Sequence, residues 1–115
     1  MTAPSLNLIV LRAANPGLLA SFYSNLGFQF EVEKHGTGPE HLAANTGGST
    51  FEIYPKTTAD SDTSAVRLGF RVGSISQILG DLGDKVDVIT SPSRSEWGMR
   101  CVLRDPEGHK VELVE

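Results

Sequence analysis

The sequence lacks most of the features that would take it out of the class of small globular proteins. It has one cysteine, Cys101, so an internal disulfide is excluded. Its Lys and Arg residues form no basic run and its net charge is −4, which argues against nucleic acid as a partner. The longest apolar run, Leu8 to Leu11, is far too short to span a bilayer, so we expect no membrane insertion. The first residues lack the basic and apolar segments of a signal peptide, and we expect a cytoplasmic protein.

What the sequence does contain is a near repeat of itself. Residues 50–54 resemble residues 110–114, which is a step of 60 positions. The same step carries residues 6–10 onto 66–70. Self-similarity at a fixed step indicates repeated supersecondary units, none of which buries its apolar face alone. We therefore expect the function to lie where two copies meet.

The element order in each half is predicted as β-α-β-β-β. In the first half, Asn15 followed by Pro16 is typical of a helix start, and Gly27 of a helix end. In the second half, apolar residues at helical spacing predict a helix between Ser74 and Gly83. Strands are expected where branched apolar residues cluster or alternate with polar ones, at 6–11, 28–34, 41–44, 50–54, 66–72, 86–90, 97–103 and 109–114.

Two such halves predict a single α+β domain over residues 1–115. Module one is expected at about 5–55 and module two at about 65–115, joined by a polar, aperiodic linker at about 56–64. We expect the strands to form a curved mixed sheet with both helices on one face. The other face would then bend around a cavity.

Because side chains alternate across a strand, parity assigns residues to the two faces of this sheet. One set is wholly apolar and is expected to meet the helices: Leu8, Val10, Phe51, Ile53, Leu68, Phe70, Val72, Val111 and Leu113. The opposite set is polar and is expected to line the cavity: Asn7, Glu52, Tyr54, Arg67, Arg71 and Glu112. An ordinary solvated face is the simpler alternative for these polar residues.

The second hairpin strand of each half adds further candidates. If the two tight turns are equivalent, His41 lies across from Glu52, and Cys101 lies across from Glu112. Trp97 and Met99 then share the face of Cys101, and the segment 91–96 before Trp97 is expected to be a loop that acts as a lid. Cys101 is interpreted as a small apolar wall residue, and His35 and His109 as solvated turn residues.

Three segments carry a resemblance to a known family: residues 19–28 (LASFYSNLGF), residues 68–72 (LGFRV), and Trp97-Gly98 followed by residues 105–113 (DPEGHKVEL). They resemble the vicinal oxygen chelate superfamily, which includes glyoxalase I, bleomycin-resistance proteins and extradiol dioxygenases. The last segment is the most specific. The resemblance covers essentially the whole chain and implies paired β-α-β-β-β modules.

In metal-dependent members, the resemblance implies one metal ligand on the first and the last strand of each module. Carried over, those positions are Asn7, Glu52, Arg67 and Glu112. A guanidinium has no lone pair for a metal, so we expect Arg67 to bridge the two carboxylates where the ion would sit. We therefore predict no cofactor and no catalytic metal. The alternative is a divalent Zn, Ni or Fe ion at a displaced site built from His41, Glu52, Glu112 and Asn7.

These expectations lead to a metal-free small-molecule binding protein, similar to the bleomycin-resistance branch of the superfamily. The ligand, a cationic or aromatic compound, would lie against Tyr54, Trp97 and Met99. Groups that would orient it are Arg67, Glu52, Glu112 and His41. The resemblance implies a homodimer. The alternatives are a metal-dependent lyase, isomerase or dioxygenase with Glu52 or Glu112 as general base, and an accessory protein with a filled cavity.

Overall fold

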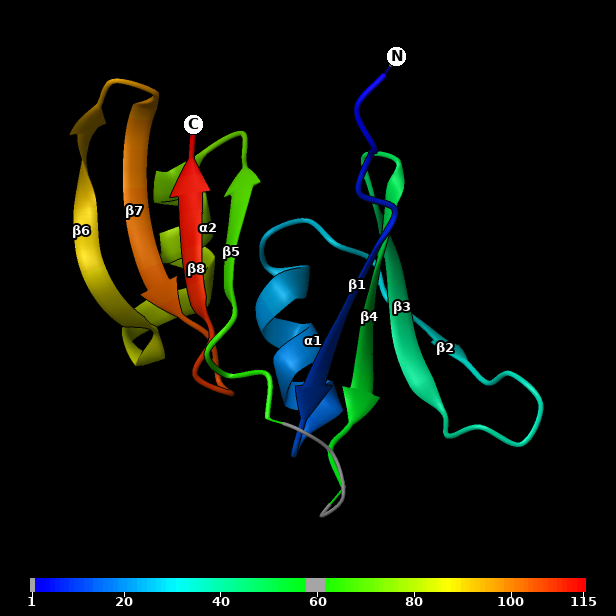
Figure 1. The fold of residues 1–115 in the computed structure, drawn as a ribbon. Coiled ribbons are helices and arrows are strands. Elements are labelled where there is room, and N and C mark those ends of the chain that lie inside the picture. The colour runs from blue at the N-terminus through cyan, green and yellow to red at the C-terminus, as the bar shows by residue number, and fades with distance from the viewer. Residues whose placement is uncertain (1, 58–61) are drawn as a thin grey trace.

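The chain folds into two four-stranded mixed sheets with one longer helix each (Figure 1). The structure is a computed structural model that describes residues 2–57 and 62–115. The first sheet and its helix comprise β1 (Leu8–Ala13), α1 (Pro16–Ser24), β2 (Glu31–Glu33), β3 (His41–Thr46) and β4 (Ser49–Pro55). The second set comprises β5 (Arg67–Arg71), α2 (Ile75–Leu82), the 3-10 turn η1 (Gly83–Lys85), β6 (Asp87–Ser95), β7 (Gly98–Arg104) and β8 (Lys110–Val114). The predicted α+β fold with two tandem β-α-β-β-β modules is confirmed.

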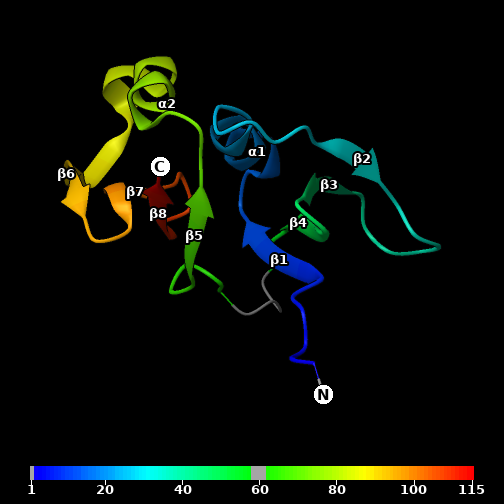
Figure 2. The same ribbon diagram turned by 90° about the horizontal axis from the view of Figure 1, so that it is seen from above.

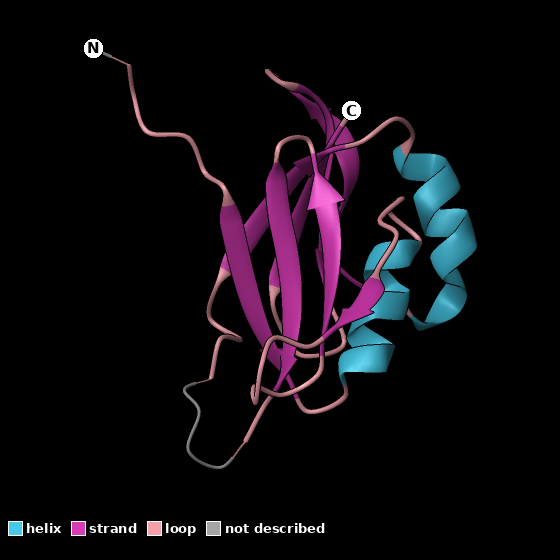
Figure 3. Ribbon diagram, turned by 90° about the vertical axis from the view of Figure 1, so that its right-hand side faces the viewer, coloured by secondary structure: helices cyan, strands magenta, loops and turns pink. Residues whose placement is uncertain are grey.

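Both sheets have the same topology. Their strand orders are β1-β4-β3-β2 and β5-β8-β7-β6, and in each the first strand pairs in parallel with the last. The remaining pairs are antiparallel. The edge strands β1 and β5 lie next to each other at the middle of the molecule (Figures 1 and 2). Figure 3 shows both helices on one side of the strands, so the opposite face of each sheet is open.

The two helices begin where the sequence predicts. The Asn15 side chain accepts a hydrogen bond from the Leu18 amide at 3.1 Å, and Pro16 occupies the first turn. The Ser74 hydroxyl accepts one from the Gln77 amide at 3.2 Å. Neither helix is long and apolar enough to cross a membrane, and the described part of the chain contains no other that is.

The core lies between the helices and the inner face of both sheets. Phe51 and Ile53 of β4 and Val111 and Leu113 of β8 are fully buried there, as parity predicts. In β1, parity gave the wrong face: Leu11 and Ala13 are buried in the core, whereas Leu8 is exposed. The predicted strand at 6–11 is displaced by two residues to 8–13.

Aromatic packing joins the two modules. Phe70 of β5 lies among rings of the first module, with centroids 5.2 Å from Phe28, 6.0 Å from Tyr23 and 6.2 Å from Phe51. The contacts with Phe28 and Tyr23 are edge-to-face and that with Phe51 is stacked, and aromatic pairs of both kinds add to the free energy gained by burying each ring. The core is therefore continuous across the two sheets.

A buried polar network crosses the same boundary. The Tyr23 hydroxyl donates to the Asp105 carboxylate at 2.7 Å, and His109 Nδ1 lies 2.9 Å from the same carboxylate. On the other side of the ring, Thr63 Oγ1 lies 2.8 Å from His109 Nε2 and also accepts from the Arg12 amide at 3.1 Å. His109 is fully buried, so the prediction of a solvated His109 is wrong. Its two ring nitrogens both have partners, which explains why a polar ring is tolerated in the interior.

The repeat step is not uniform along the chain. In the parallel ladders Leu8 pairs with Thr50 and Arg67 with Lys110, so the first strand steps by 59 positions while the last steps by 60. The helix caps, Asn15 and Ser74, also step by 59. The extra residue lies in the β7–β8 hairpin, where Val102 pairs with Glu112, ten positions apart, whereas in the β3–β4 hairpin Ala43 pairs with Glu52, nine positions apart.

The segment predicted as a lid belongs to a strand instead. Residues 91–95 form the second half of β6 and pair with β7, with irregular register between Val88 and Ser93. Pro92 is tolerated because β6 is an edge strand, where a missing amide proton costs no ladder bond. Only Glu96 and Trp97 lie in the turn. Part of the predicted linker, residues 58–61, lies outside the described residues.

Candidate functional site

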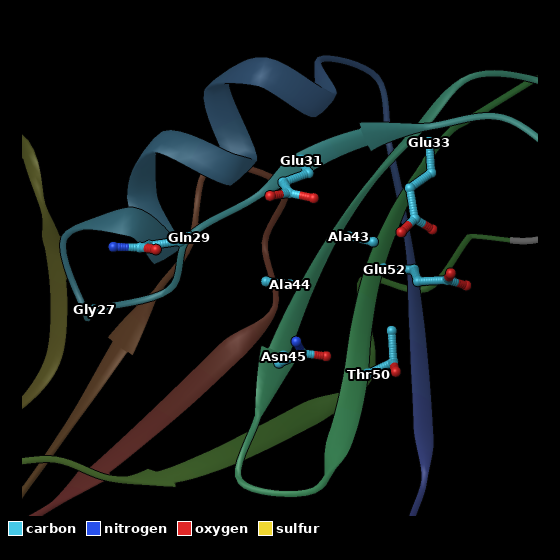
Figure 4. Close-up of a pocket in the computed structure, with 9 residues that line it drawn as sticks. All are labelled: Gly27, Gln29, Glu31, Glu33, Ala43, Ala44, Asn45, Thr50 and Glu52. Carbon is cyan, nitrogen blue, oxygen red and sulfur yellow. The ribbon is translucent and has the colours of Figure 1, made fainter.

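The open face of the first sheet holds a pocket of about 530 Å³ (Figure 4). Its lining residues come from the segment after α1 and from β2, β3 and β4: Gly27, Gln29, Glu31, Glu33, Ala43, Ala44, Asn45, Thr50 and Glu52. Three of them are glutamates and none is basic. Phe28 and Phe30 pack against the core, and the residues between and after them, Gln29, Glu31 and Glu33, line the pocket. The predicted alternation of this segment therefore holds.

Glu33 and Glu52 meet at the imidazole of His41. The register places Glu33 of β2 beside His41 of β3, while Glu52 of β4 lies opposite Ala43. His41 Nε2 lies 3.5 Å from Glu33 Oε1 and 3.4 Å from Glu52 Oε2. The prediction that His41 lies directly across from Glu52 is wrong by two residues, because Ala43 holds that position, but the two side chains do share a face and lie close together.

The ring of His41 packs against two other rings. Tyr54 stacks on it with centroids 4.2 Å apart and planes inclined by 7°, and the tilted ring of His35 has its centroid 5.2 Å away. The side chain of His41 is 1% exposed, and that of Glu52 is 13% exposed. Nδ1 lies 3.3 Å from the Pro39 carbonyl, whereas Nε2 is buried without a hydrogen-bond partner. Arg12 completes the stack, with its guanidinium carbon 5.0 Å from the centre of the Tyr54 ring.

A separate polar cluster lies on the open face of the second sheet, around Glu112. Its Oε1 accepts from Arg100 Nε at 2.9 Å and Nη2 at 2.6 Å, and from Arg67 Nη2 at 3.1 Å. The hydrogen bond from Arg100 lowers the pKa of Glu112; partial burial opposes this effect, and Arg67 adds to the lowering. Glu112 is therefore a carboxylate already neutralised by its neighbours.

The predicted arginine bridge between the two carboxylates does not form. Arg67 binds Glu112, but within residues 2–57 and 62–115 no side chain pairs with both Glu112 and Glu52. The two acids lie on different sheets and have different partners. The predicted displaced site of His41, Glu52, Glu112 and Asn7 is also wrong in composition, because Glu112 belongs to the arginine cluster.

The candidates on β7 lie elsewhere than predicted. Cys101 pairs with Leu113, and Val102 pairs with Glu112, so Cys101 faces the core and is fully buried. The cause is the longer β7–β8 turn, since a register change of one residue moves a side chain to the opposite face. Burial raises the pKa of the Cys101 thiol, with Arg100 acting in the opposite direction, which disfavours a nucleophilic thiolate. Met99 packs against the core, and Trp97 is 61% exposed in the β6–β7 turn.

The strand positions that the resemblance assigns to a metal do not fit one here. Asn7 is exposed and precedes β1, and the residue beside Glu52 in the β1–β4 ladder is Val10. In the second module Gly69 lies beside Glu112 in the β5–β8 ladder. The Glu112 carboxylate already forms ion pairs with Arg67 and Arg100. Neither Val10 nor Gly69 has a side-chain atom that can bind a metal. The strand positions therefore do not provide enough ligands for an ion shared between the two modules.

Sequence reasoning missed three residues of the two clusters. Glu33 and His35 lie with His41 and Glu52, and the four offer ligand atoms that are all within 4.8 Å of one another. Arg100 is the strongest partner of Glu112. The alternation of residues 28–34 placed Glu33 on the face of Gln29, and this signal could have identified it. Nothing in the sequence places His35, because it lies beyond the end of β2.

Comparison with known proteins gives a family assignment. The sequence model of the Glyoxalase/Bleomycin resistance protein/Dioxygenase superfamily matches residues 5–113. No curated protein matches the sequence closely enough to count as a relative.

Similar solved structures are found at low sequence identity. TnmS3, an antibiotic binding protein from Streptomyces sp. CB03234, is 18% identical with a TM-score of 0.76, covering 99% of this chain and 97% of its own. A glyoxalase/bleomycin resistance protein from the same organism is 18% identical with a TM-score of 0.74, covering 96% of this chain and 100% of its own. Oxidase ChaP-H2 is 14% identical with a TM-score of 0.76, covering 97% and 93%.

At these identities the solved structures support the fold alone, whereas the sequence match spans nearly the whole chain. The chain belongs to the glyoxalase/bleomycin resistance protein/dioxygenase superfamily.

Proposed function

We propose that this protein binds a small cationic organic molecule on the open face of its first module, without a catalytic metal shared between the modules. The observation that carries the proposal is the pocket of about 530 Å³, whose lining includes Glu31, Glu33 and Glu52 and no basic residue. Its volume falls in the range typical of small-molecule sites. Gln29, Asn45 and Thr50 supply neutral hydrogen-bonding groups around the carboxylates.

The charge arrangement favours a cation over an anion. Three carboxylates on one concave surface give a negative potential that attracts a positive ligand and repels a negative one. Tyr54 lies at the margin of this surface, stacked on His41. An aromatic amine would combine an ammonium group for the glutamates with a flat ring for the aromatic margin. A similar protein is described as an antibiotic binding protein, which is consistent with a small-molecule ligand.

A ligand screen tests this proposal. Thermal-shift measurements would compare aromatic amines with aromatic carboxylates of the same size at fixed salt. A ligand present at 100 times its Kd stabilises the folded state by about 2.7 kcal/mol. We expect stabilisation by amines only, weakened in Glu31→Gln and unchanged in Glu96→Gln, which removes one charge from the distant β6–β7 turn. Binding of carboxylates, or equal binding by both variants, would contradict the proposal.

We further propose that the working form is a homodimer. The radius of gyration is 14.8 Å, whereas a compact chain of this length has a value of about 13 Å. Leu8, Val88, Ile89 and Trp97 are large apolar residues left exposed on or next to the strands. The acidic face of the first module and the arginine-rich face of the second offer complementary charge to a second copy. Sedimentation at varied concentration tests this: a monomer at all concentrations would exclude it, and we expect Arg67→Glu with Arg100→Glu to dissociate the dimer.

The other candidate function is a metal-dependent lyase, isomerase or dioxygenase of the same superfamily. One observation favours it, namely the cluster of Glu33, His35, His41 and Glu52. Glu52, half-buried beside a histidine, is the group that would accept a proton from a bound substrate. Loss of turnover in Glu52→Gln, with ligand affinity retained, would distinguish this enzyme from a binding protein. The cytoplasm is the compartment we propose, because the single cysteine is buried and has no partner for a disulfide.

A further inference from the structure

The buried imidazole of His41 has one nitrogen, Nε2, without a hydrogen-bond partner among the residues that the structure describes. Nδ1 lies 3.3 Å from the Pro39 carbonyl, and an acceptor at this position requires the proton to be on Nδ1. Nε2 belongs to a side chain that is 1% exposed and faces the carboxylates of Glu33 and Glu52. A nitrogen and two carboxylates directed at one point are unfavourable unless a cation, either a proton or a metal ion, lies between them.

His35 supplies a fourth donor at the same point. Its Nε2 lies 3.3 Å from Glu33 Oε1, and the four residues can place one ligand atom each within 4.8 Å of all the others. In a tetrahedral zinc site with bonds of about 2.0 Å, neighbouring ligand atoms are about 3.3 Å apart. Three of the separations among these atoms, 3.3, 3.4 and 3.5 Å, are close to that value.

We propose that Glu33, His35, His41 and Glu52 bind one divalent transition-metal ion, with Zn²⁺ best matched, entirely within the first module. Two imidazoles and two carboxylates are ligands that zinc accepts, and the hydrogen bond from Nδ1 to a backbone carbonyl is the usual way of orienting a metal-bound histidine. The site differs from the strand positions that the resemblance assigns to a metal, since it shares with them only Glu52. It does not depend on the proposed organic ligand.

The positions of the four ligands in the fold indicate a structural role for this ion. Glu33 ends β2, a strand of three residues at the sheet edge, and His35 lies in the hairpin that leads to β3. His41 begins β3 and Glu52 lies in β4. An ion held by all four would tie the short edge strand and its hairpin to the centre of the sheet. Four protein ligands close the coordination sphere, which is typical of a structural zinc site.

The other buried histidine shows the contrast. His109 also lies beside a carboxylate, but both of its ring nitrogens are paired, with Asp105 and with Thr63. That network is complete without an ion. His41 is the buried side chain whose nitrogen has no hydrogen-bond partner in the described part of the chain.

Titration with Co²⁺ and Zn²⁺ tests the proposal on the full chain after chelator treatment. We expect one Co²⁺ per chain, with the intense visible absorption of four-coordinate cobalt, and displacement of that ion by Zn²⁺. Because loss of even an outer-shell partner costs at least about tenfold in metal affinity, His35→Ala and Glu33→Gln should each weaken binding by about tenfold or more. The His35 side chain is 73% exposed and that of Glu33 is 40% exposed, so neither belongs to the core and these variants should fold.

The matched control is Glu31→Gln, which removes the same charge from the same strand and pocket but leaves the four ligands intact. Its affinity should remain within about threefold of the unmodified protein, a change of less than 0.7 kcal/mol at about 1.4 kcal/mol per tenfold. Absence of saturable binding, the pale spectrum of six-coordinate cobalt, or an equal loss in Glu31→Gln would each overturn the site. Amine binding is measured separately on the metal-free protein, so failure of one proposal leaves the other standing.

Discussion

The Tyr23 hydroxyl donates a 2.7 Å hydrogen bond to the carboxylate of Asp105, and this contact joins α1 of the first module to the β7–β8 turn of the second. Both side chains are buried. Burial and the adjacent carboxylate raise the pKa of Tyr23 above its ordinary value. For Asp105, burial acts to raise the pKa, but hydrogen bonds from His109 and Tyr23 outweigh it and the pKa is lowered. The carboxylate is thus ionised and the phenol neutral at neutral pH.

Tyr23→Phe should destabilise the protein by about 1.5–3 kcal/mol, the range for a hydrogen bond to a charged group. The variant keeps the ring contacts with Phe51 and Phe70 and removes only the donor. Urea unfolding followed by circular dichroism measures the change. Tyr54→Phe, on the open face, is the matched control and should change the free energy of unfolding by less than about 0.5 kcal/mol. A loss of the same size in both variants would show that the Asp105 contact is not special.

Stability should fall on acidification because of Asp105 and Glu112. Both have a lowered pKa in the folded state, so each binds a proton less readily when folded than when unfolded. Their contribution is therefore complete above the unfolded-state pKa, about 4, and is lost as the pH falls through the folded-state values. Urea midpoints measured between neutral and acidic pH should show this decline. Glu112→Gln should make the loss of stability with falling pH shallower. An unchanged pH dependence in that variant would show that Glu112 does not contribute to it.

The two arginines that bind Glu112 should not be equivalent. Arg100 makes two hydrogen bonds and is 26% exposed, whereas Arg67 makes one and is 49% exposed. Exposed ion pairs contribute about 0–1 kcal/mol. The Arg100 pair is the less exposed of the two, and its contacts with Oε1, at 2.6 and 2.9 Å, are shorter than the 3.1 Å contact of Arg67. We expect Arg100→Ala to destabilise more than Arg67→Ala and to raise the pKa of Glu112 further, as measured by carboxyl NMR titration. The reverse order would mean that Arg67 is the main partner.

Two glycines should respond in opposite ways to alanine. Gly98 has φ of +116°, and a Cβ there would lie 2.5 Å from the Glu115 carbonyl oxygen, so Gly98→Ala should destabilise by more than about 1 kcal/mol. Gly80 lies within α2 with open space around it, and Gly80→Ala should stabilise by about 0.5–1 kcal/mol. Thermal unfolding of both variants under identical conditions checks the pair. A stabilised Gly98→Ala would show that the end of β8 moves aside at little cost.

Helix caps and strand alternation predicted much of the fold because each depends on residues that are close together in the sequence. The caps at Asn15 and Ser74 depend on side chains within three residues of the helix start, and both are present. Which side chains of β4, β5 and β8 face the core follows from the alternation of side chains along a strand. Parity failed in β1, where the run from Leu8 to Leu11 is apolar on both faces and so does not fix which face is buried.

The site was harder to predict because it depends on register and on non-local contacts. Cys101 was assigned to the open face on the assumption of equal turns, and one extra residue reversed it. Arg100 then took the position beside Glu112. His35 joins the site through the path of a hairpin loop, which no periodicity describes. His41 was identified, because its place on β3 tolerated a shift of two residues without a change of face.

The longer β7–β8 turn distinguishes the second half of the chain from the first. It carries Asp105, Glu107 and His109, and the Glu107 carboxylate accepts hydrogen bonds from the amides of Ala14 and Asn15, at the entrance to α1. The turn therefore ties the second half to the first. Its register also places Arg100, rather than Cys101, beside Glu112, whereas Glu33 and Glu52 of the first sheet lie beside a histidine. Two halves with one topology thus present open faces of different electrostatic character.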